Sequence, residues 1–422
     1  MQRSAQNHNL TQMKKLITTF TFLSLLFFLS CEDDTLIPAP AGSDTDTVTI
    51  AEGNEVLVSS NISADATWSS DSVYVLGGRI SVTSGVTLTI EAGTIIKGQY
   101  GTGANATALV IARGARLNAS GTATAPIIFT AVADEIQPGE IVSPNMTADA
   151  AGLWGGLIIL GKAPASLGDN ALETNIEGIP TSDINGLYGG ADAADNSGAI
   201  SYISIRHGGS NIGEGNEING LTLGGVGSGT RIEGVEVVAN ADDGIEWFGG
   251  TVDVSKVLIW NSNDDGLDTD QDWQGTCSDY VIVTPQGGSA FELDGAEGTA
   301  KVNGAAGFHT FSNGVVYVGA DADHVVDWDD ATNAALVDLY IYGWGDYSGT
   351  AIESFAGDGS GTSSGWETTL NEGDTLASVL GIEAAAITSE VTVGARTKGP
   401  EKAVFDTWTW AGLSGALTTI GL

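Results

Sequence analysis

Cysteine, proline and positive charge are all scarce in this chain. Only 2 of its 422 residues are cysteine and 9 are proline, while 53 acids stand against 15 lysines and arginines, for a formal net charge of -38. Two thiols exclude a fold built on several disulfides. A surface this negative repels nucleic acid and anionic lipid headgroups, so we expect no nucleic-acid partner.

A short pattern, an apolar residue followed by an acid, recurs in the second half of the chain. Because side chains alternate across a strand, the apolar residue of each copy points inward and the acid outward. A period in the low twenties with one such strand per copy fits one coil of a parallel β-helix. We therefore predict an all-β, single-stranded parallel β-helix with loop insertions and a small C-terminal cap. The first acids of the copies, at spacings of 22, 24, 35 and 26 residues, are Glu246, Asp268, Glu292, Asp327 and Glu353.

Stacking these coils would place the acids in a column with rungs about 4.8 Å apart. Neighbouring carboxylates at that distance repel by roughly 1 kcal/mol in water, so the column needs bound cations, raised pKa values, a basic partner or side chains that splay into water. One alternative is that the acids have no binding role and only keep the surface soluble. Another is that the aspartates of the Asp-Asp-Gly groups cap turns. Calcium takes six to eight hard oxygen ligands, so we predict a calcium site. Its candidate ligands are Asp242, Asp243, Glu246, Asp264, Asp265, Asp268, Asp270, Glu292 and Asp294.

Two further repeats set the expected stacking. Residues 87–98 overlay residues 108–119 at a shift of 21, which pairs Leu88 with Leu109. Asn240 and Asn261 precede the Asp-Asp-Gly groups at the same spacing. We expect these two asparagines to form a stacked ladder at a corner of the coil, because asparagine tolerates the left-handed conformation.

Two polar insertions, 133–151 and 165–198, interrupt the repeats. Loops of this length in a repeat protein tend to gather on one face and to carry binding. Trp154 and Tyr188 lie beside or within them, and we predict that both rings stack on a sugar, with core packing as the alternative. The acidic positions predicted to complete the ligand-binding face are Asp327 and Glu353.

Residues from about 356 onward are predicted to form the cap. Asp374 is expected to begin a short helix that runs from Thr375 to about Ile382. Residues 405–417 alternate aromatic and polar side chains, so we expect a final strand packed on the end of the stack.

The N-terminal segment carries an export signal. Residues 1–30 are predicted to be a signal peptide, with Met13 as the true start, because two lysines precede an apolar run too short to span a membrane. The run ends at Cys31, and this junction resembles the lipobox of bacterial lipoproteins, which implies lipidation at Cys31. The acids that follow it resemble the surface-export signal of Bacteroidota. Residues 31–47 then form a tether, and residues 48–422 the β-helix domain.

Together the signal and the coils resemble the β-helical surface lipoproteins of Bacteroidota, with the right-handed parallel β-helix of the pectate-lyase-like superfold. The resemblance implies a lipid-anchored protein on the outer membrane at the cell surface, accessory to a TonB-dependent transporter in nutrient capture. We expect a non-catalytic platform that binds a glycan or cations, and we assign no catalytic residue. A calcium-dependent polysaccharide lyase or glycoside hydrolase, and an adhesin or structural surface protein, are the alternatives.

Overall fold

The computed structural model describes residues 49–50, 54–168, 171–212, 218–283, 287–297, 307–329, 332–355 and 363–422. The chain divides into two units between Thr45 and Asp46, and every described residue belongs to the second. The predicted signal peptide, the lipidation site Cys31 and the tether lie outside the described residues. Within the described part, no helix has the length and apolar character needed to cross a membrane.

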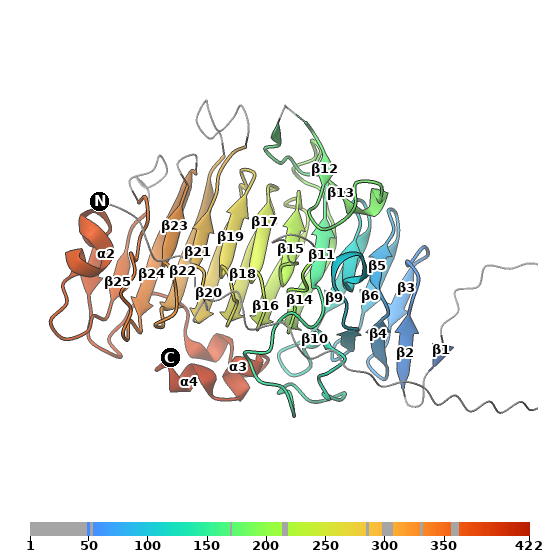
Figure 1. The fold of residues 1–422 in the computed structure, drawn as a ribbon, viewed down its shortest axis with the longest axis horizontal. Helices are drawn as coiled ribbons and strands as arrows, with labels where there is room; N and C mark the ends of the chain where they lie inside the picture. The colour runs from blue at the N-terminus through green and yellow to red at the C-terminus, as the bar shows by residue number, and fades with distance from the viewer. Residues whose placement is uncertain are drawn as a thin grey trace, which may run out of the picture. The chain divides into compact units, whose positions relative to one another are not determined.

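Two long sheets wind through the second unit (Figure 1). We call the first the eight-stranded wall; its strands pair in parallel from the first coil to the last. They are β5 (Arg79–Val82), β8 (Ala108–Ile111), β11 (Leu157–Leu160), β15 (Leu221–Gly224), β17 (Ile245–Phe248), β19 (Leu267–Asp270), β21 (Phe291–Leu293) and β23 (Val326–Trp328).

The second sheet, the sixteen-stranded wall, is also parallel except where β1 pairs with β2. Its strands are β1 (Thr49–Ile50), β2 (Glu55–Val58), β3 (Ala66–Trp68), β4 (Val73–Leu76), β6 (Thr87–Ile90), β7 (Ile95–Gly98), β9 (Arg116–Ser120), β10 (Ile127–Ala131), β14 (Gly198–Arg206), β16 (Arg231–Val238), β18 (Val254–Trp260), β20 (Thr276–Val283), β22 (His309–Tyr317), β24 (Ala334–Tyr342), β25 (Trp366–Thr368) and β26 (Thr388–Glu390).

The long strands of the sixteen-stranded wall each bend once. The bend is a residue with positive φ, and the strand register stacks these residues from coil to coil, as with Tyr202, Gly234 and Lys256 at φ 50, 76 and 57°. Each coil from β14 onward therefore has three sides, one from the eight-stranded wall and two from a bent long strand. In the earlier coils, pairs of short strands such as β9 and β10 take the place of the two halves of a long strand. The architecture is a right-handed parallel β-helix, which confirms the predicted fold class.

The interior of the coil is apolar along its whole length. Ile245, Leu267, Phe291 and Val326 stack on successive rungs, and all four side chains are fully buried. Ile352 follows by a bridge to Val326 and packs against the same core. The inward apolar column predicted from the repeat is thus confirmed.

The pairing predicted from the 21-residue shift, Leu88 with Leu109, is wrong. Leu88 pairs with Leu117, whereas Leu109 pairs with Ile80. The coil in this region is longer than 21 residues, because a turn with a short 3-10 helix, Gly103–Asn105, separates β7 from β8. The overlay matched strands that lie on different sides of the coil.

The asparagine ladder is also wrong. β16 and β18 align Val238 with Trp260, so the next residues, Ala239 and Asn261, occupy the same corner, at φ 55 and 59°. Asn240 instead lies buried one position later, where its amide donates to the backbone oxygen of Asp243 at 2.8 Å.

The two insertions lie against different parts of the coil, so the expectation that they share one face is wrong. The segment 133–151 contacts the sixteen-stranded wall, where the Asn261 amide donates to Ala148 O at 2.8 Å. The segment 165–198 holds the hairpin of β12 (Thr174–Asn175) and β13 (Leu187–Tyr188) and a 3-10 turn, Ile184–Gly186. It packs on outward-facing residues of the eight-stranded wall.

The last coil is closed by α2 (Leu376–Ala385), which lies beyond β25 in Figure 1. Leu380 and Ala384 of this helix join the interior core, as expected of a cap. Thr375, not Asp374, is the N-cap, because its hydroxyl accepts from Ser378 N and Ser378 returns the bond. The predicted helix is confirmed with these shifted bounds.

The predicted final strand at 405–417 is wrong. The segment forms a 3-10 turn, Lys402–Val404, and two short helices, α3 (Trp410–Leu413) and α4 (Ala416–Thr419). Figure 1 shows these helices beside the long strands and not at the end of the stack. Phe405 and Trp408 pack there on outward apolar residues such as Leu258 and Val281.

Candidate functional site

The predicted acids form a column on the outer side of the eight-stranded wall. The strand register pairs Glu246 with Asp268, Asp268 with Glu292, and Glu292 with Asp327. Glu353 follows through the bridge between Val326 and Ile352. We call these five residues the strand column; the structure brings all five to neighbouring rungs.

A second set of polar residues stands at the corner just before these strands. By the same register, Asp243 is followed by Asp265 and then by Ser289. Asp243 Oδ1 accepts from Asp265 N at 2.9 Å, and Asp265 Oδ1 accepts from Ser289 N. These two aspartates therefore cap the corner of the next coil, as the turn-capping alternative proposes. Capping uses one carboxylate oxygen of each aspartate and leaves the second oxygen for other contacts. We call the set the corner column; its members are Asn219, Asp243, Asp265, Ser289 and His324.

The two columns meet in a buried trio of carboxyl groups. Oxygens of Asp243, Glu246 and Asp268 lie within 4.8 Å of one another, and the residues are 6, 8 and 8 % exposed. Burial raises the pKa of all three carboxyl groups well above the usual range, and the neighbouring carboxylates raise it further. Among the described residues, Asp268 Oδ1 has no hydrogen-bond partner, so this buried oxygen remains available for a ligand.

An amide borders the trio. Asn219 Nδ2 donates to Glu246, while Asn219 Oδ1 is buried and has no hydrogen-bond partner among the described residues. The three carboxylates of the trio are hard oxygen donors of the kind that calcium takes. The residues present therefore fit the predicted cation.

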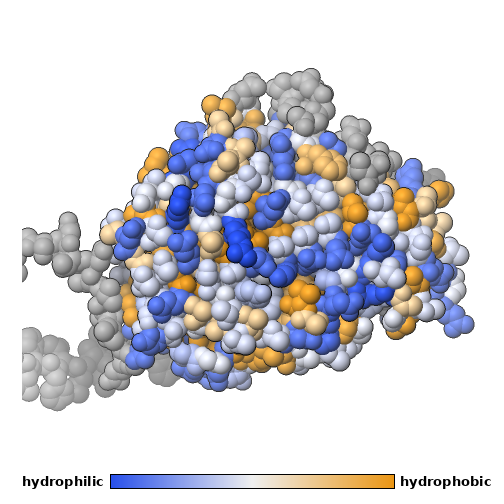
Figure 2. Space-filling view, turned by 180° about the vertical axis from the view of Figure 1, so that it is seen from behind, coloured by the Kyte–Doolittle hydropathy of each residue, from blue (hydrophilic) through white to orange (hydrophobic). Residues whose placement is uncertain are grey.

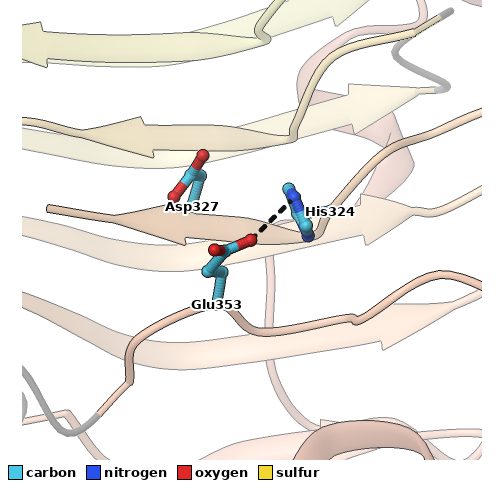
Figure 3. A group of neighbouring side chains, drawn as sticks. All are labelled: His324, Asp327 and Glu353. Carbon is cyan, nitrogen blue, oxygen red and sulfur yellow. Dashed lines mark ion pairs between the residues drawn. The ribbon is translucent and has the colours of Figure 1, made fainter.

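The arrangement of the trio recurs along the wall. Each copy combines a corner residue, the strand acid three positions later and the acid on the next rung. Asp265 and Glu292 share a hydrogen bond, which together with burial raises the pKa of Glu292 to about 9. His324, Asp327 and Glu353 hold these places in the last copy (Figure 3), again with donor atoms within 4.8 Å.

Other predicted ligands lie beside the trio. Asp242 and Asp264 bring oxygens within 4.8 Å of each other and of Asp243 nearer the surface. Asp270 stands two residues after Asp268, and burial raises its pKa to about 7. Asp294 is the neighbour of Asp270 on the next rung, and its charge adds to that shift.

The two aromatic residues predicted to stack on a sugar do not expose their rings at the protein surface. Trp154 is fully buried and donates to Arg206 O at 2.7 Å. Tyr188 is 1 % exposed, and its hydroxyl donates to Gln271 at 2.6 Å. Core packing, the alternative use, accounts for both, so the stacking prediction is corrected.

A cavity of about 640 Å³ opens where the insertion 165–198 meets the ends of β8 and β11. Arg113 and Lys162 line it together with Ser84 and Asn185. Arg113 donates to Gly189 O at 2.8 Å and pairs with Glu173. Lys162 alone among the described lysines has no oxygen partner; the paired ones are Lys97, Lys256, Lys398 and Lys402.

Reasoning from the sequence missed three of these residues. Asn219 and His324 lie in the corner column, but neither belongs to an Asp-Asp-Gly group, so only the strand register reveals them. Lys162 comes two residues after the end of the buried strand β11, and its position between an insertion and the wall had no signal in the repeat.

Chemically, the wall can bind a cation through oxygen ligands or share a proton between paired carboxyl groups. The described thiol offers no alternative, because Cys277 is fully buried and burial raises its pKa. Figure 2 shows the molecule from behind the view of Figure 1, and on this surface hydrophilic residues are interspersed with scattered hydrophobic ones.

A family model agrees with this architecture. Residues 60–377 match the model of the family described as pectate-lyase like beta helix domain. A similar solved structure is the pectin methylesterase from Aspergillus niger in deglycosylated form, with 11 % identity and a TM-score of 0.30 over 73 % of this chain and 89 % of that one. No curated protein matches the chain.

Proposed function

The chain belongs to the pectate-lyase-like β-helix family, and from this premise we propose that it is a non-catalytic binding platform that holds calcium on its eight-stranded wall and captures a glycan. The observation that carries the proposal is the buried trio of Asp243, Glu246 and Asp268 with an unpartnered oxygen. Ionising such a trio without a counter-cation is costly. A bound calcium ion offsets that cost and leaves coordination positions for sugar hydroxyl or carboxylate oxygens.

The proposed setting is the cell surface. The lipobox-like junction at Cys31 and the acids after it support a lipid anchor in the outer membrane of a member of the Bacteroidota. A protein held there can pass a captured glycan to a TonB-dependent transporter, which is the partner we propose.

Calcium is expected to stabilise the wild-type protein and not the Asp268→Asn variant. At a calcium concentration a hundredfold above its dissociation constant, binding to the folded state adds about 2.7 kcal/mol to the free energy of unfolding. The measurement is urea unfolding at pH 8 in EGTA and in calcium. Glu390→Gln, which changes an exposed acid on β26, should respond to calcium as the wild type does. Identical unfolding curves of the wild type in EGTA and in calcium would contradict the proposed calcium site.

The glycan is proposed to enter the cavity near Lys162. The Lys162 ammonium, which pairs with no described residue, and the Arg113 guanidinium favour an acidic sugar, since a hydrogen bond to a charged group contributes roughly 1.5–3 kcal/mol. Lys162→Gln is therefore expected to weaken binding of a glucuronate-containing oligosaccharide by about tenfold or more, measured by calorimetry. Lys256→Gln, a change at a lysine paired with Glu233 on the other wall, is the matched control. Equal affinities of the two variants would contradict this part of the proposal.

A hydrolase is the second candidate, and the hydrogen bond between the Glu246 and Asp268 carboxyl groups favours it. A carboxyl group whose pKa is raised keeps its proton near neutral pH and can act as a general acid on a glycosidic bond. Release of reducing ends from a bound polysaccharide, lost in Glu246→Gln, would support hydrolysis over simple capture.

A further inference from the structure

The last copy of the repeated trio differs from the first in one ligand. In the first copy the corner residue is Asp243, and in the last it is His324. The two strand acids keep their places, as Glu246 and Asp268 in one and Asp327 and Glu353 in the other. The wall thus repeats one geometry with a nitrogen donor in place of a carboxylate.

The contacts of His324 orient its ring toward the acids. Its Nδ1 lies 2.7 Å from Thr350 O, and a carbonyl can only accept, so Nδ1 carries the hydrogen. In the neutral ring Nε2 then presents its lone pair, and this atom lies 3.1 Å from Glu353 Oε2. Figure 3 shows the ring and the Glu353 carboxylate turned toward each other with Asp327 beside them, and donor atoms of all three lie within 4.8 Å of one another.

The backbone holds these three residues in place. Val326 bridges Ile352, and Glu353 N donates to Val326 O at 2.9 Å. The His324 and Glu353 side chains are 22 and 53 % exposed. A cation can therefore reach the site from solvent and keep water as its remaining ligands.

We propose that His324, Asp327 and Glu353 form a second cation site, one that prefers a divalent cation of the zinc class over calcium. A neutral imidazole nitrogen with two carboxylate oxygens and open positions for water is a ligand set for zinc, cobalt or manganese. Calcium prefers oxygen ligands throughout. The carbonyl behind Nδ1 fixes the tautomer, as the outer partners of metal-bound histidines do.

Cobalt and zinc added to the full protein provide the test. We expect a visible cobalt absorption band and a calorimetric zinc signal with one binding event at this site. His324→Gln should weaken zinc binding by about a hundredfold or more, because even the loss of an outer partner costs 10- to 100-fold. His324→Asp, which recreates the ligand types of the first trio, should lose zinc preference and gain calcium binding. Glu390→Gln should bind zinc as the wild type does.

An ion pair between His324 and Glu353 is the competing account of the same contact. Absence of the cobalt band and of zinc binding in the wild type would establish that account and overturn the site, as would undiminished zinc affinity in His324→Gln. The site does not depend on calcium at the first trio. Zinc binding should persist in the Glu246→Gln, Asp268→Asn double variant, so failure at one site is distinguishable from failure at the other.

Discussion

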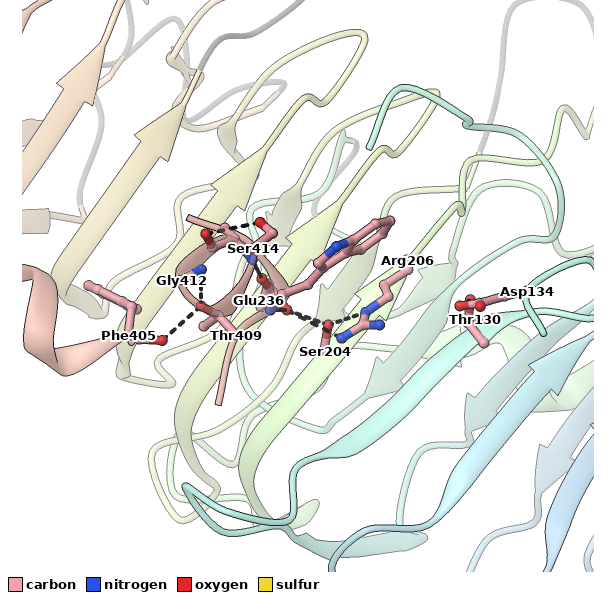
Figure 4. Close-up of polar contacts among 11 residues, drawn as sticks. Thr130, Asp134, Ser204, Arg206, Glu236, Phe405, Thr409, Gly412 and Ser414 are labelled. Atoms are coloured by element: carbon pink, nitrogen blue, oxygen red, sulfur yellow. Dashed lines mark hydrogen bonds and ion pairs between the residues drawn. The ribbon is translucent and has the colours of Figure 1, made fainter. Parts of the chain in front are cut away.

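Glu236→Ala is expected to lower the free energy of unfolding by about 3–5 kcal/mol and to release the C-terminal segment, because breaking one side of a buried ion pair leaves a buried charge uncompensated. Glu236 and Arg206 are both fully buried, with 3.8 Å between Glu236 Oε2 and Arg206 Nη2. The Glu236 carboxylate also accepts from Trp410 N at 3.0 Å and Ala411 N at 2.9 Å. Figure 4 shows Glu236 between Ser204 and the segment that holds Thr409 and Gly412.

Urea unfolding and hydrogen exchange of residues 402–422 measure the two parts of this result. The variant loses the acceptor for the first turn of α3, so the amides of Trp410 and Ala411 should exchange much faster than in the wild type. Glu233→Gln is the matched control on the same strand. Glu233 forms solvent-accessible, partly exposed pairs with Arg231 and Lys256, and surface pairs contribute about 0–1 kcal/mol. If Glu236→Ala were no less stable than this control, the C-terminal segment would not depend on the buried pair.

This contact also explains why the sequence misled us at residues 405–417. Alternating aromatic and polar residues predicted a strand, yet the segment turns into helices around a glutamate that lies over 170 residues earlier in the chain. No local pattern encodes such a partner. A signal did exist in the strands that the segment covers: residues 257–260 and 280–283 are apolar on both sides, which is typical of strands buried on both faces.

The strand column was predictable for the opposite reason. It depends on one residue per coil and on stacking between adjacent coils, so spacing in the sequence becomes position on the wall. The 21-residue overlay failed because two sides of the same coil share an apolar pattern, and Leu88 resembles Leu109 as well as its true partner Leu117. Periodicity identifies a coil, but the lengths of its corners decide which residues become neighbours.

In a buffer without divalent cations, the free energy of unfolding is expected to fall by several kcal/mol as the pH rises from about 5 to about 9. Asp270 and Glu292 have folded pKa values of about 7 and about 9, against 3.8 and 4.5 for the free groups. Between the free and the folded values, the folded state retains protons that the unfolded state has released, so rising pH favours unfolding. Each pKa unit corresponds to about 1.4 kcal/mol of stability. At the less buried Glu292, solvent screening makes this contribution smaller.

The measurement is urea unfolding across this pH range at about 0.5 M NaCl, where the repulsion between exposed acids is screened and that between buried carboxyl groups persists. Glu292→Gln removes one titrating group and should flatten the curve above pH 7, whereas the exposed Glu390→Gln should leave it unchanged. Calcium should restore stability at high pH, since it binds the ionised carboxylates and competes with their protons. A stability that stays constant from pH 5 to 9 without calcium would mean that the stacked acids ionise freely, and the wall would then have no electrostatic reason to bind a cation.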